Sequence, residues 1–504
     1  MEPLDSEDPA PGGARSARPA PGQTGPWTGL WAGVARADVT DYGAGPANDP
    51  LCVKALVLRD SSTAAAIVTV DAVAVAEIGS VPAGFLDEVR AALCDDPGLA
   101  ATQLVIGASH CHGTVCADVA RHTVQAVRTA WGAAVPVRAG AGAGHEDRIQ
   151  ENRRLKLKSG READVRRAYS LAADEEVEAV GPIDPQIGIL RLDRLDGSTL
   201  AVVYNFACHP IQGVPGGGNT ADLVGFASAV VEASCGPGAL ALFLQGCGGD
   251  INPVLYKDVD HPRDAEPLGN LLGLSVVRAV KQIRCRDAAP LRLASSTLGL
   301  PRADLAPPIA ALETAQDQLL ASLTGTTLDL KTFLQLAARY NLAGAYPSGH
   351  AHRYLHDRSL GRRDLDRLDE ENRRHMAEYA ARVRTMEELT RVRTNLDLLR
   401  AHQARSTAAG SATVRVEILG LRVGDFVLLT FPGELSVEIG LRLKEASPHA
   451  LTFVATCTNG YIYYAPTAQQ LRNRGWAQED SDCLLAPQWQ EVFEARVHGM
   501  LRGL

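Results

Sequence analysis

The sequence predicts an α/β protein in which layered mixed sheets are flanked by helices and interrupted by a helical insertion. Short buried apolar runs alternate with amphipathic stretches of helical period, which is the pattern of repeated strand–helix units. Residues 303–410 break this alternation, because they hold only helical periodicity. With 504 residues, of which 46% are hydrophobic, the chain is long and apolar enough to bury a sizeable core.

Strand–helix units are predicted in order along the first part of the chain. Each begins with a run of aliphatic residues and continues into a segment with apolar residues three and four apart. The predicted pairs are Ala64–Ala76 with Val81–Cys94, Gln103–Ile106 with Val115–Trp131, Leu200–Tyr204 with Ala221–Ser234, and Ala239–Leu244 with Pro267–Ile283. Because every unit adds a strand and a helix that packs on it, we expect a sheet covered by helices.

Residues 303–410 are predicted to form a helical insertion or lid. The segment is charged and rich in Leu and Ala at helical spacing, most clearly over residues 362–393. Strand signals return after it and the chain closes with a helix, at Thr413–Leu421, Phe426–Phe431, Leu451–Ala455 and Trp489–Leu501. We therefore expect one main domain from residues 28–302 and 411–504, preceded by a flexible tail over residues 1–27.

Composition excludes several classes of partner. The net charge of -9 argues against a nucleic-acid-binding protein and favours a small-molecule substrate. No basic segment leads into an apolar signal-peptide region, and no run of about 18 apolar residues predicts a transmembrane segment. The ten cysteines include no C-x-x-C pair, which is typical of buried thiols in a reducing compartment. We expect a cytoplasmic protein, and a homo-oligomer stays open.

Two polar motifs sit where predicted strands end. Residues 107–113 read GASHCHG, with His110 and His112, and residues 205–210 read NFACHP, with His209. Ligand sites of open α/β sheets lie at such strand ends. Because a neutral imidazole can bind a metal or move a proton near neutral pH, convergence of the two motifs would create a site of metallohydrolase type.

Three further motifs follow predicted strands. The glycine-dense loop at residues 246–253 fits either an oxyanion hole or a plain tight turn. Glu434 follows a Pro-Gly turn and is predicted to open a helix, either as a metal ligand or as a charge at the helix N-terminus. Tyrosines 461, 463 and 464 have aromatic packing as their simplest explanation. Histidine, glutamate and tyrosine together, without a cysteine triad, suit zinc in an open catalytic site.

With these residues in this order, the sequence resembles the neutral/alkaline non-lysosomal ceramidases, and more closely their bacterial ceramidase-like relatives of unassigned substrate. The resemblance extends from Gly33 to about Thr467. Besides the motifs above, it includes Gly33–Thr40, Asp49–Leu51, Lys54–Leu58, Asn152–Leu155, Asp184–Pro185, Gly188–Arg191 and Thr220–Asp222. The number and order of these matches make the resemblance specific.

The resemblance implies a zinc-dependent catalytic domain. It implies that Zn²⁺ is held by two histidines, a glutamate and a tyrosine, here His110, His209, Glu434 and Tyr464. Tyr464 is preferred to Tyr461 because it holds the place of the tyrosine before the family's Val-Thr-Thr turn. The resemblance also places His112 near the scissile bond. It further suggests substrate-binding roles for Arg153, Gly248, Gly249 and Tyr461 and catalytic roles for Asp250 and Asn252.

Two departures from the family pattern change what we expect. The ceramidases carry a serine within Gly-Asp-x-Ser-Pro, where this chain has Asn252 after Asp250. Asparagine cannot form an acyl-enzyme, although its amide can donate a hydrogen bond to an oxyanion. We also expect no C-terminal immunoglobulin-like domain, since the chain ends about forty residues after Tyr464. Membrane ceramide is therefore not the expected substrate.

The sequence predicts a metal-dependent amidohydrolase that cleaves a linear N-acyl bond of a small molecule. Zinc-bound hydroxide is the expected nucleophile, and His112 is expected either to act as general base or to hydrogen-bond the tetrahedral intermediate. Three alternatives stay open: an acyl-transfer or amide-forming enzyme on the same zinc site, an enzyme acting on an ester or lactone, and a non-catalytic zinc-containing binding protein.

Overall fold

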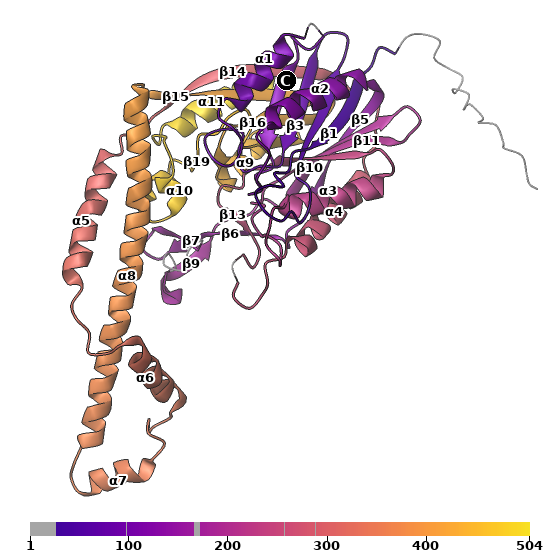
Figure 1. The fold of residues 1–504 in the computed structure, drawn as a ribbon. Coiled ribbons are helices and arrows are strands. Elements are labelled where there is room, and N and C mark those ends of the chain that lie inside the picture. The colour runs from indigo at the N-terminus through magenta and orange to yellow at the C-terminus, as the bar shows by residue number, and fades with distance from the viewer. Residues whose placement is uncertain (1–26, 97, 166–171, 257, 288) are drawn as a thin grey trace, which may run out of the picture.

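Layers of sheet and helix make up the body of the molecule, and an arm of helices extends from it (Figure 1). The computed structural model describes residues 27–96, 98–165, 172–256, 258–287 and 289–504. The predicted tail therefore lies outside the described residues, except for Trp27. Within the described part of the chain, no helix is both long and apolar enough to cross a membrane. The α/β class, with layered mixed sheets and a helical insertion, is confirmed.

The larger sheet has eight strands in the order β12-β11-β10-β5-β1-β2-β3-β4. The two outermost pairs, β3–β4 and β11–β12, are parallel, and all other neighbours are antiparallel. The bounds are β1 Trp31–Asp38, β2 Cys52–Arg59, β3 Ala64–Val70, β4 Gln103–Ala108, β5 Val135–His145, β10 Gln186–Arg194, β11 Thr199–Phe206 and β12 Leu240–Gln245. Each parallel pair is a βαβ unit closed by a helix, α1 (Phe85–Cys94) or α3 (Asp222–Cys235).

Strand β5 bends the larger sheet. Val135 and Pro136 pair with β1, whereas residues 137–145 pair with β10. The pairing directions show that β3 and β4 run opposite to β11 and β12. In a flat sheet, the two histidine motifs would therefore lie at opposite ends of the strands. The bend instead brings β12 into contact with β3 and β4. The motifs therefore meet because the sheet curls, and not because they lie at the same end of the strands in an open sheet.

The smaller sheet packs on the inner face of the larger one. It has the order β14-β15-β16-β18, with bounds β14 Leu291–Pro301, β15 Thr413–Val423, β16 Phe426–Thr430 and β18 Thr452–Ala455. Leu190 and Leu242 of the larger sheet share one buried cluster with Leu419 and Leu421 of the smaller sheet. Strands β16 and β18 are buried along their whole length, whereas β14 and part of β15 alternate buried with more exposed residues.

Helices cover the outer faces of both sheets. On the larger sheet, α2 (Val119–Gly132) packs on β1 and β2, while α3 and α4 (Ala265–Val280) share a buried cluster with β11 and β12. On the smaller sheet, α11 (Trp489–Gly503) places Trp489 and Phe493 against Phe431. The helices lie near the predicted ranges. The result is a helix–sheet–sheet–helix arrangement around two apolar interfaces.

Two element predictions were wrong near the site. The predicted strand Ala64–Ala76 ends at Val70, and the residues after Asp71 form a buried loop. Glu434 does not open a helix: it begins the short strand β17 (Glu434–Leu435), and α9 starts only at Val437 and ends at Glu445. The physical reason is a non-local partner, since β17 pairs with β19 (Tyr464–Ala465).

The insertion forms an arm, which we define as residues 303–410. Its helices are α5 Ala306–Ser322, α6 Leu330–Leu342, α7 Ala351–Ser359 and α8 Asp364–Ala409. Figure 1 shows α5 beside α8, with α6 and α7 at the end remote from the sheets. The arm is inserted between β14 and β15, which pair from Leu291↔Val423 to Pro301↔Thr413. Because this antiparallel pair holds both ends of the arm together, the insertion leaves the sheet intact.

Short elements complete the body. They are β6 Gln150–Asn152, β7 Arg154–Leu157, β8 Glu162–Asp164, β9 Val177–Val180, β13 Ile251–Pro253 and α10 Gln478–Ser481. After Tyr464, the described residues form β19, short helical turns and α11, and no β-sandwich.

Candidate metal centre

Three of the predicted zinc ligands meet at one buried point. His110 follows β4, His209 follows β11, and Glu434 begins β17. Their ligand atoms all lie within 4.8 Å of one another, and the three residues are at most 4% exposed. Two imidazoles and a carboxylate at this spacing form the kind of donor set that Zn²⁺ takes in proteins.

The backbone after β4 turns sharply to aim His110. The Ser109 and His110 amides donate to the carbonyls of Val70 and Ala72, at 2.8 and 2.9 Å. His110 itself has φ +71°, a left-handed conformation that is uncommon for a residue with a Cβ. Such a conformation persists only where surrounding contacts enforce it, and it is concentrated at functional sites.

Backbone carbonyls fix the tautomer of both histidines. His110 Nδ1 lies 2.6 Å from the Val73 carbonyl oxygen, and His209 Nδ1 lies 2.9 Å from that of Ile251. A carbonyl oxygen can only accept, so each Nδ1 carries the proton that it donates. The Nε2 atoms therefore face the carboxylate: Glu434 Oε2 lies 3.4 Å from that of His110 and 3.0 Å from that of His209. Carbonyls in this position orient metal-binding histidines.

Burial and charge set the protonation of the group. Burial lowers the pKa of His209 to about 4, and the charge of Arg153 contributes to the fall. Burial would raise the pKa of Glu434, but its interactions with His110 and His209 hold that pKa well below the usual range. Burial would lower the pKa of His110, yet Cys457 and Glu434 raise it well above its usual value. The pKa values of the two histidines are therefore shifted in opposite directions, although both lie beside Glu434.

The two tyrosines that the sequence proposed contact different parts of the centre. Tyr461 Oη donates a 2.5 Å hydrogen bond to Glu434 Oε1, so it orients the carboxylate. Tyr464 lies beside Glu434 in the β17–β19 pair, and its Oη accepts a 3.4 Å hydrogen bond from Arg153 Nη2. Both side chains line the same cavity. Tyr464 as the fourth ligand stays a prediction.

A cavity of about 460 Å³ is lined by the three candidate ligands. His112 lines it, with its ring centroid 6.1 Å from that of His110. Its surroundings lower the pKa of His112, mainly through loss of solvent and then through the charge of His110. A neutral imidazole facing the cavity can accept a proton, which is what a general base requires.

Arg153 forms part of the cavity wall and is held by buried partners. Its Nε donates to Glu479 Oε1 at 2.5 Å, its Nη1 donates to Asn252 Oδ1 at 3.0 Å, and its Nη2 donates to the Gly249 carbonyl. The residue is 1% exposed. A guanidinium fixed on so many sides keeps one orientation, so it can position Tyr464 and present a constant charge to the cavity.

The glycine-rich loop lies behind the cavity, and none of residues 248–252 is among the described residues that line it. The Gly249 amide donates to the Leu435 carbonyl at 2.9 Å, so this N–H is not free to form an oxyanion hole. A Cβ on Gly249 would lie about 3 Å from the carbonyl oxygens of Glu434 and Leu435. The missing side chain thus lets the loop approach β17 closely.

Asp250 and Asn252 act from this loop on their neighbours. Asp250 Oδ1 accepts from the Val437 amide at 2.8 Å, which ties the loop to the start of α9. Burial raises the pKa of Asp250 to about 6. Asn252 is 2% exposed and accepts from Arg153, so both residues support the cavity wall from behind.

Sequence reasoning missed an acidic pair near the C-terminus. Glu479 and Asp480 are at most 1% exposed, and Asp480 binds Arg154 through both oxygens at 2.9 Å. The segment QEDSD resembles a solvated charged turn, so its composition gives no signal of burial. The adjacent arginines 153 and 154 were the available signal, because two buried cations need carboxylate partners.

A second group of possible ligands, Cys116, Asp118 and His122, lies at the surface. Arg121 donates a hydrogen bond to Asp118 and lies 3.3 Å from His122 Nε2. A fixed cation among the donors opposes binding of a second cation. The buried group is therefore the stronger candidate.

The chain matches no protein-family model and no curated protein sequence. Its fold is similar to that of two solved structures. A ceramidase complexed with C2 has a TM-score of 0.59 and 15% identity, over 94% of this chain and 75% of that one. The neutral ceramidase from Pseudomonas aeruginosa has a TM-score of 0.58 and 16% identity, over 95% and 75%. The predicted resemblance is confirmed for the fold, which is that of the ceramidases.

Proposed function

We propose that this protein is a metal-dependent hydrolase that cleaves the acyl–amide bond of a small molecule. The carrying observation is the buried group of His110, His209 and Glu434 at the base of a cavity, with both imidazoles oriented by backbone carbonyls. The fold similarity to ceramidases supports the choice of an amide bond. The three ligands are the same residues that the sequence alone proposes.

The donor set fits Zn²⁺. Two nitrogens and a carboxylate leave room for a tyrosine oxygen and a substrate, which is the open arrangement of catalytic zinc sites. We assign the fourth protein ligand to Tyr464, because the hydrogen bond from Arg153 to its Oη favours the phenolate form. When bound, Zn²⁺ supplies Lewis-acid polarisation of a carbonyl and acidification of water.

The chain's own residues would divide the remaining work. His112 takes a proton from the attacking water and returns it to the leaving amine. Tyr461 holds Glu434 in place through its 2.5 Å hydrogen bond. Arg153 holds Tyr464 and offers its charge to the substrate. Because Asn252 cannot serve as a nucleophile, the reaction proceeds without an acyl-enzyme.

A cytoplasmic location belongs to the same proposal. All ten cysteines are unpaired thiols, and those at positions 111, 208 and 247 are buried. Free thiols in this number persist in a reducing compartment.

The first experiment is the metal content of protein purified without chelator, beside the variant His110→Ala. A surface control, His145→Ala, keeps the ligands and tests the effect of losing any histidine. About one zinc per chain, lost only in His110→Ala, supports the proposal. No metal in the parent protein would overturn it.

Turnover is then measured on a panel of N-acyl amino acids and matched esters. Tyr464→Phe and Tyr461→Phe differ from the parent by one hydroxyl each, so they separate a ligand from a residue that orients Glu434. We expect Tyr464→Phe to lose zinc, and Tyr461→Phe to keep it with reduced turnover. Turnover of esters but no amides would refute the amide assignment, and acyl-enzyme trapped on the parent would refute the direct attack of water.

A further inference from the structure

The far end of the arm presents an unusual number of exposed leucines. We define this tip as residues 330–368, which comprise α6, α7 and the start of α8. Six of its leucines are 50–88% exposed. They are Leu330, Leu334, Leu342, Leu355, Leu360 and Leu368. Scattered exposed leucines need no explanation, but a concentration of this kind in one short segment marks an interaction surface.

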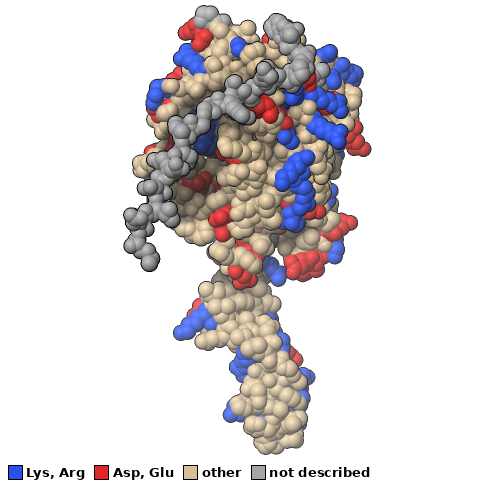
Figure 2. Space-filling view, turned by 90° about the vertical axis from the view of Figure 1, so that its right-hand side faces the viewer, with Lys and Arg blue, Asp and Glu red and all other residues tan. Residues whose placement is uncertain are grey.

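These leucines do not form the arm's own core. Aromatic residues pack α6 and α7 on α8: Phe333 stacks on Tyr379 at 4.6 Å, and Tyr340 and Tyr354 donate hydrogen bonds to Asp369. Figure 1 shows α6 and α7 at the end of the arm, remote from the sheets. The space-filling view in Figure 2 shows this end mainly as uncharged surface with Lys and Arg at its margins. The leucines are thus left for a partner outside the described chain.

Cations outnumber carboxylates along the tip. Residues 330–368 contain seven Lys and Arg and three Asp, and Asp329, Asp369, Glu370 and Glu371 flank the segment. Arg358 and Arg363 pair with Asp366. The other five cations have no carboxylate partner among the described residues, namely Lys331, Arg339, Arg353, Arg362 and Arg367. Unpaired cations beside exposed leucines complement a surface that is both apolar and anionic.

We infer that the tip docks on the surface of a bilayer that contains anionic phospholipids. Leucines of α6 and α7 enter the boundary between headgroups and acyl chains, while the unpaired cations bind phosphate and carboxylate groups of the headgroups. A second copy of the chain is a poorer partner, because the unpaired cations of one tip would face those of the other. Docking at the interface needs no spanning helix, and it holds whether or not the cavity cleaves an amide.

Vesicle co-sedimentation of the full chain tests the inference. The vesicles are pure phosphatidylcholine, or phosphatidylcholine with equal phosphatidylserine, in about 0.1 M NaCl. We expect binding at least about tenfold tighter to the anionic vesicles, weakening as salt increases. Leu334→Asp and Leu355→Asp should each weaken it several-fold. The control is Leu274→Asp, since Leu274 on α4 of the body is also 56% exposed.

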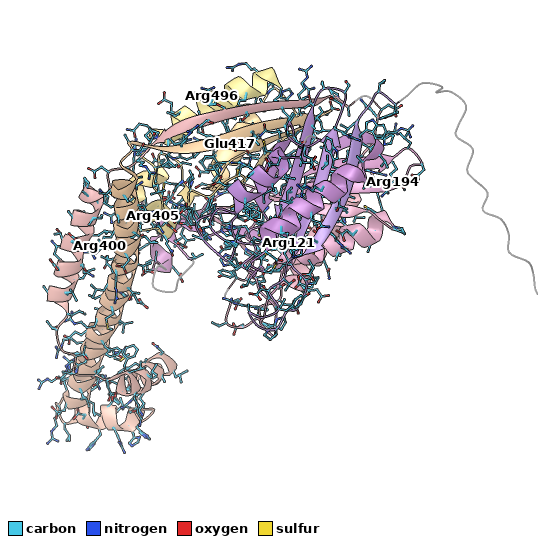
Figure 3. The ribbon with its side chains drawn as sticks, turned by 45° about the horizontal axis from the view of Figure 1, so that its top comes forward. Arg121, Arg194, Arg400, Arg405, Glu417 and Arg496 are labelled. Atoms are coloured by element: carbon cyan, nitrogen blue, oxygen red, sulfur yellow. The ribbon has the colours of Figure 1, made fainter. Side chains whose placement is uncertain are left out.

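Charge reversal tests the second half of the argument. Arg353→Glu should weaken binding to anionic vesicles, whereas Arg496→Glu, on α11 of the body, should not (Figure 3). Circular dichroism checks that every variant stays folded. The inference would be overturned if the tip variants bound anionic vesicles as tightly as the body variants do. It would also be overturned if the parent protein did not bind vesicles. Tip-dependent dimers in analytical ultracentrifugation, without vesicle binding, would identify a second copy as the partner and likewise refute it.

Discussion

The substitution Arg153→Met tests whether the cavity wall depends on one buried ion pair. Arg153 is 1% exposed, and its Nε lies 2.5 Å from Glu479, which is equally buried. Removing one partner of a buried pair leaves an uncompensated charge and costs about 3–5 kcal/mol. In this variant Glu479 still has a second cation, Arg154, at 3.5 Å. We therefore expect the free energy of unfolding to fall by about 3 kcal/mol, the lower limit of that range.

The measurement is equilibrium urea unfolding of four proteins: the parent, Arg153→Met, Glu479→Leu and the double variant. Two apolar residues can replace a buried pair at little cost, so the double variant should be more stable than the sum of the single losses predicts, by about 2 kcal/mol. A loss below about 1 kcal/mol in Arg153→Met, the range of a solvated surface pair, would refute the reasoning. Additive losses in the double variant would show that the two residues do not act together.

Three further predictions test other parts of the molecule. His402→Ala removes the 2.6 Å hydrogen bond from α8 to Asp482, which lines the cavity. It should lower the free energy of unfolding, measured by thermal unfolding, by about 1–3 kcal/mol and reduce turnover. Unchanged values would mean that the arm does not support the site. Burial raises the pKa of Asp222 from 3.8 to about 6, so the folded state favours the protonated side chain. The free energy of unfolding of the parent, relative to that of Asp222→Asn, should be greatest below about pH 4 and fall by about 3 kcal/mol as the pH rises through 6. A difference that does not depend on pH would contradict this. Gly188→Ala places a Cβ within 2.3–2.7 Å of the Phe453 ring and should cost about 1–3 kcal/mol in urea unfolding, whereas a neutral result would mean that the ring moves freely.

The base of the arm links the inserted helices to the site. The ring centroids of His402, on α8, and Tyr463 lie 4.7 Å apart. The guanidinium carbon of Arg405, also on α8, lies 4.8 Å from the centroid of the same tyrosine ring. Figure 3 shows Arg400 and Arg405 where the arm meets the body. No residue of the arm is among the described residues that line the cavity, so the arm contacts the cavity wall from outside, through Tyr463. Its use as a lid stays a prediction.

Sequence reasoning located the candidate ligands because the relevant signals are local. A histidine that directly follows an aliphatic run is placed at a strand end whatever the rest of the fold does. It also separated the strand–helix units from the arm, since helical and strand periods differ within a few residues.

The sequence by itself determined the α/β class, the helical insertion and the identity of His110, His209 and Glu434 as candidate ligands. Only the tertiary structure decided that these residues meet through the curl at β5, and that Glu434 begins a strand paired with Tyr464 rather than a helix. It alone also placed the glycine-rich loop behind the cavity and buried Glu479 and Asp480. The reason is that strand bending, non-local pairing and burial of charge depend on residues far apart in the chain, whereas periodicity and turn chemistry are properties of neighbours.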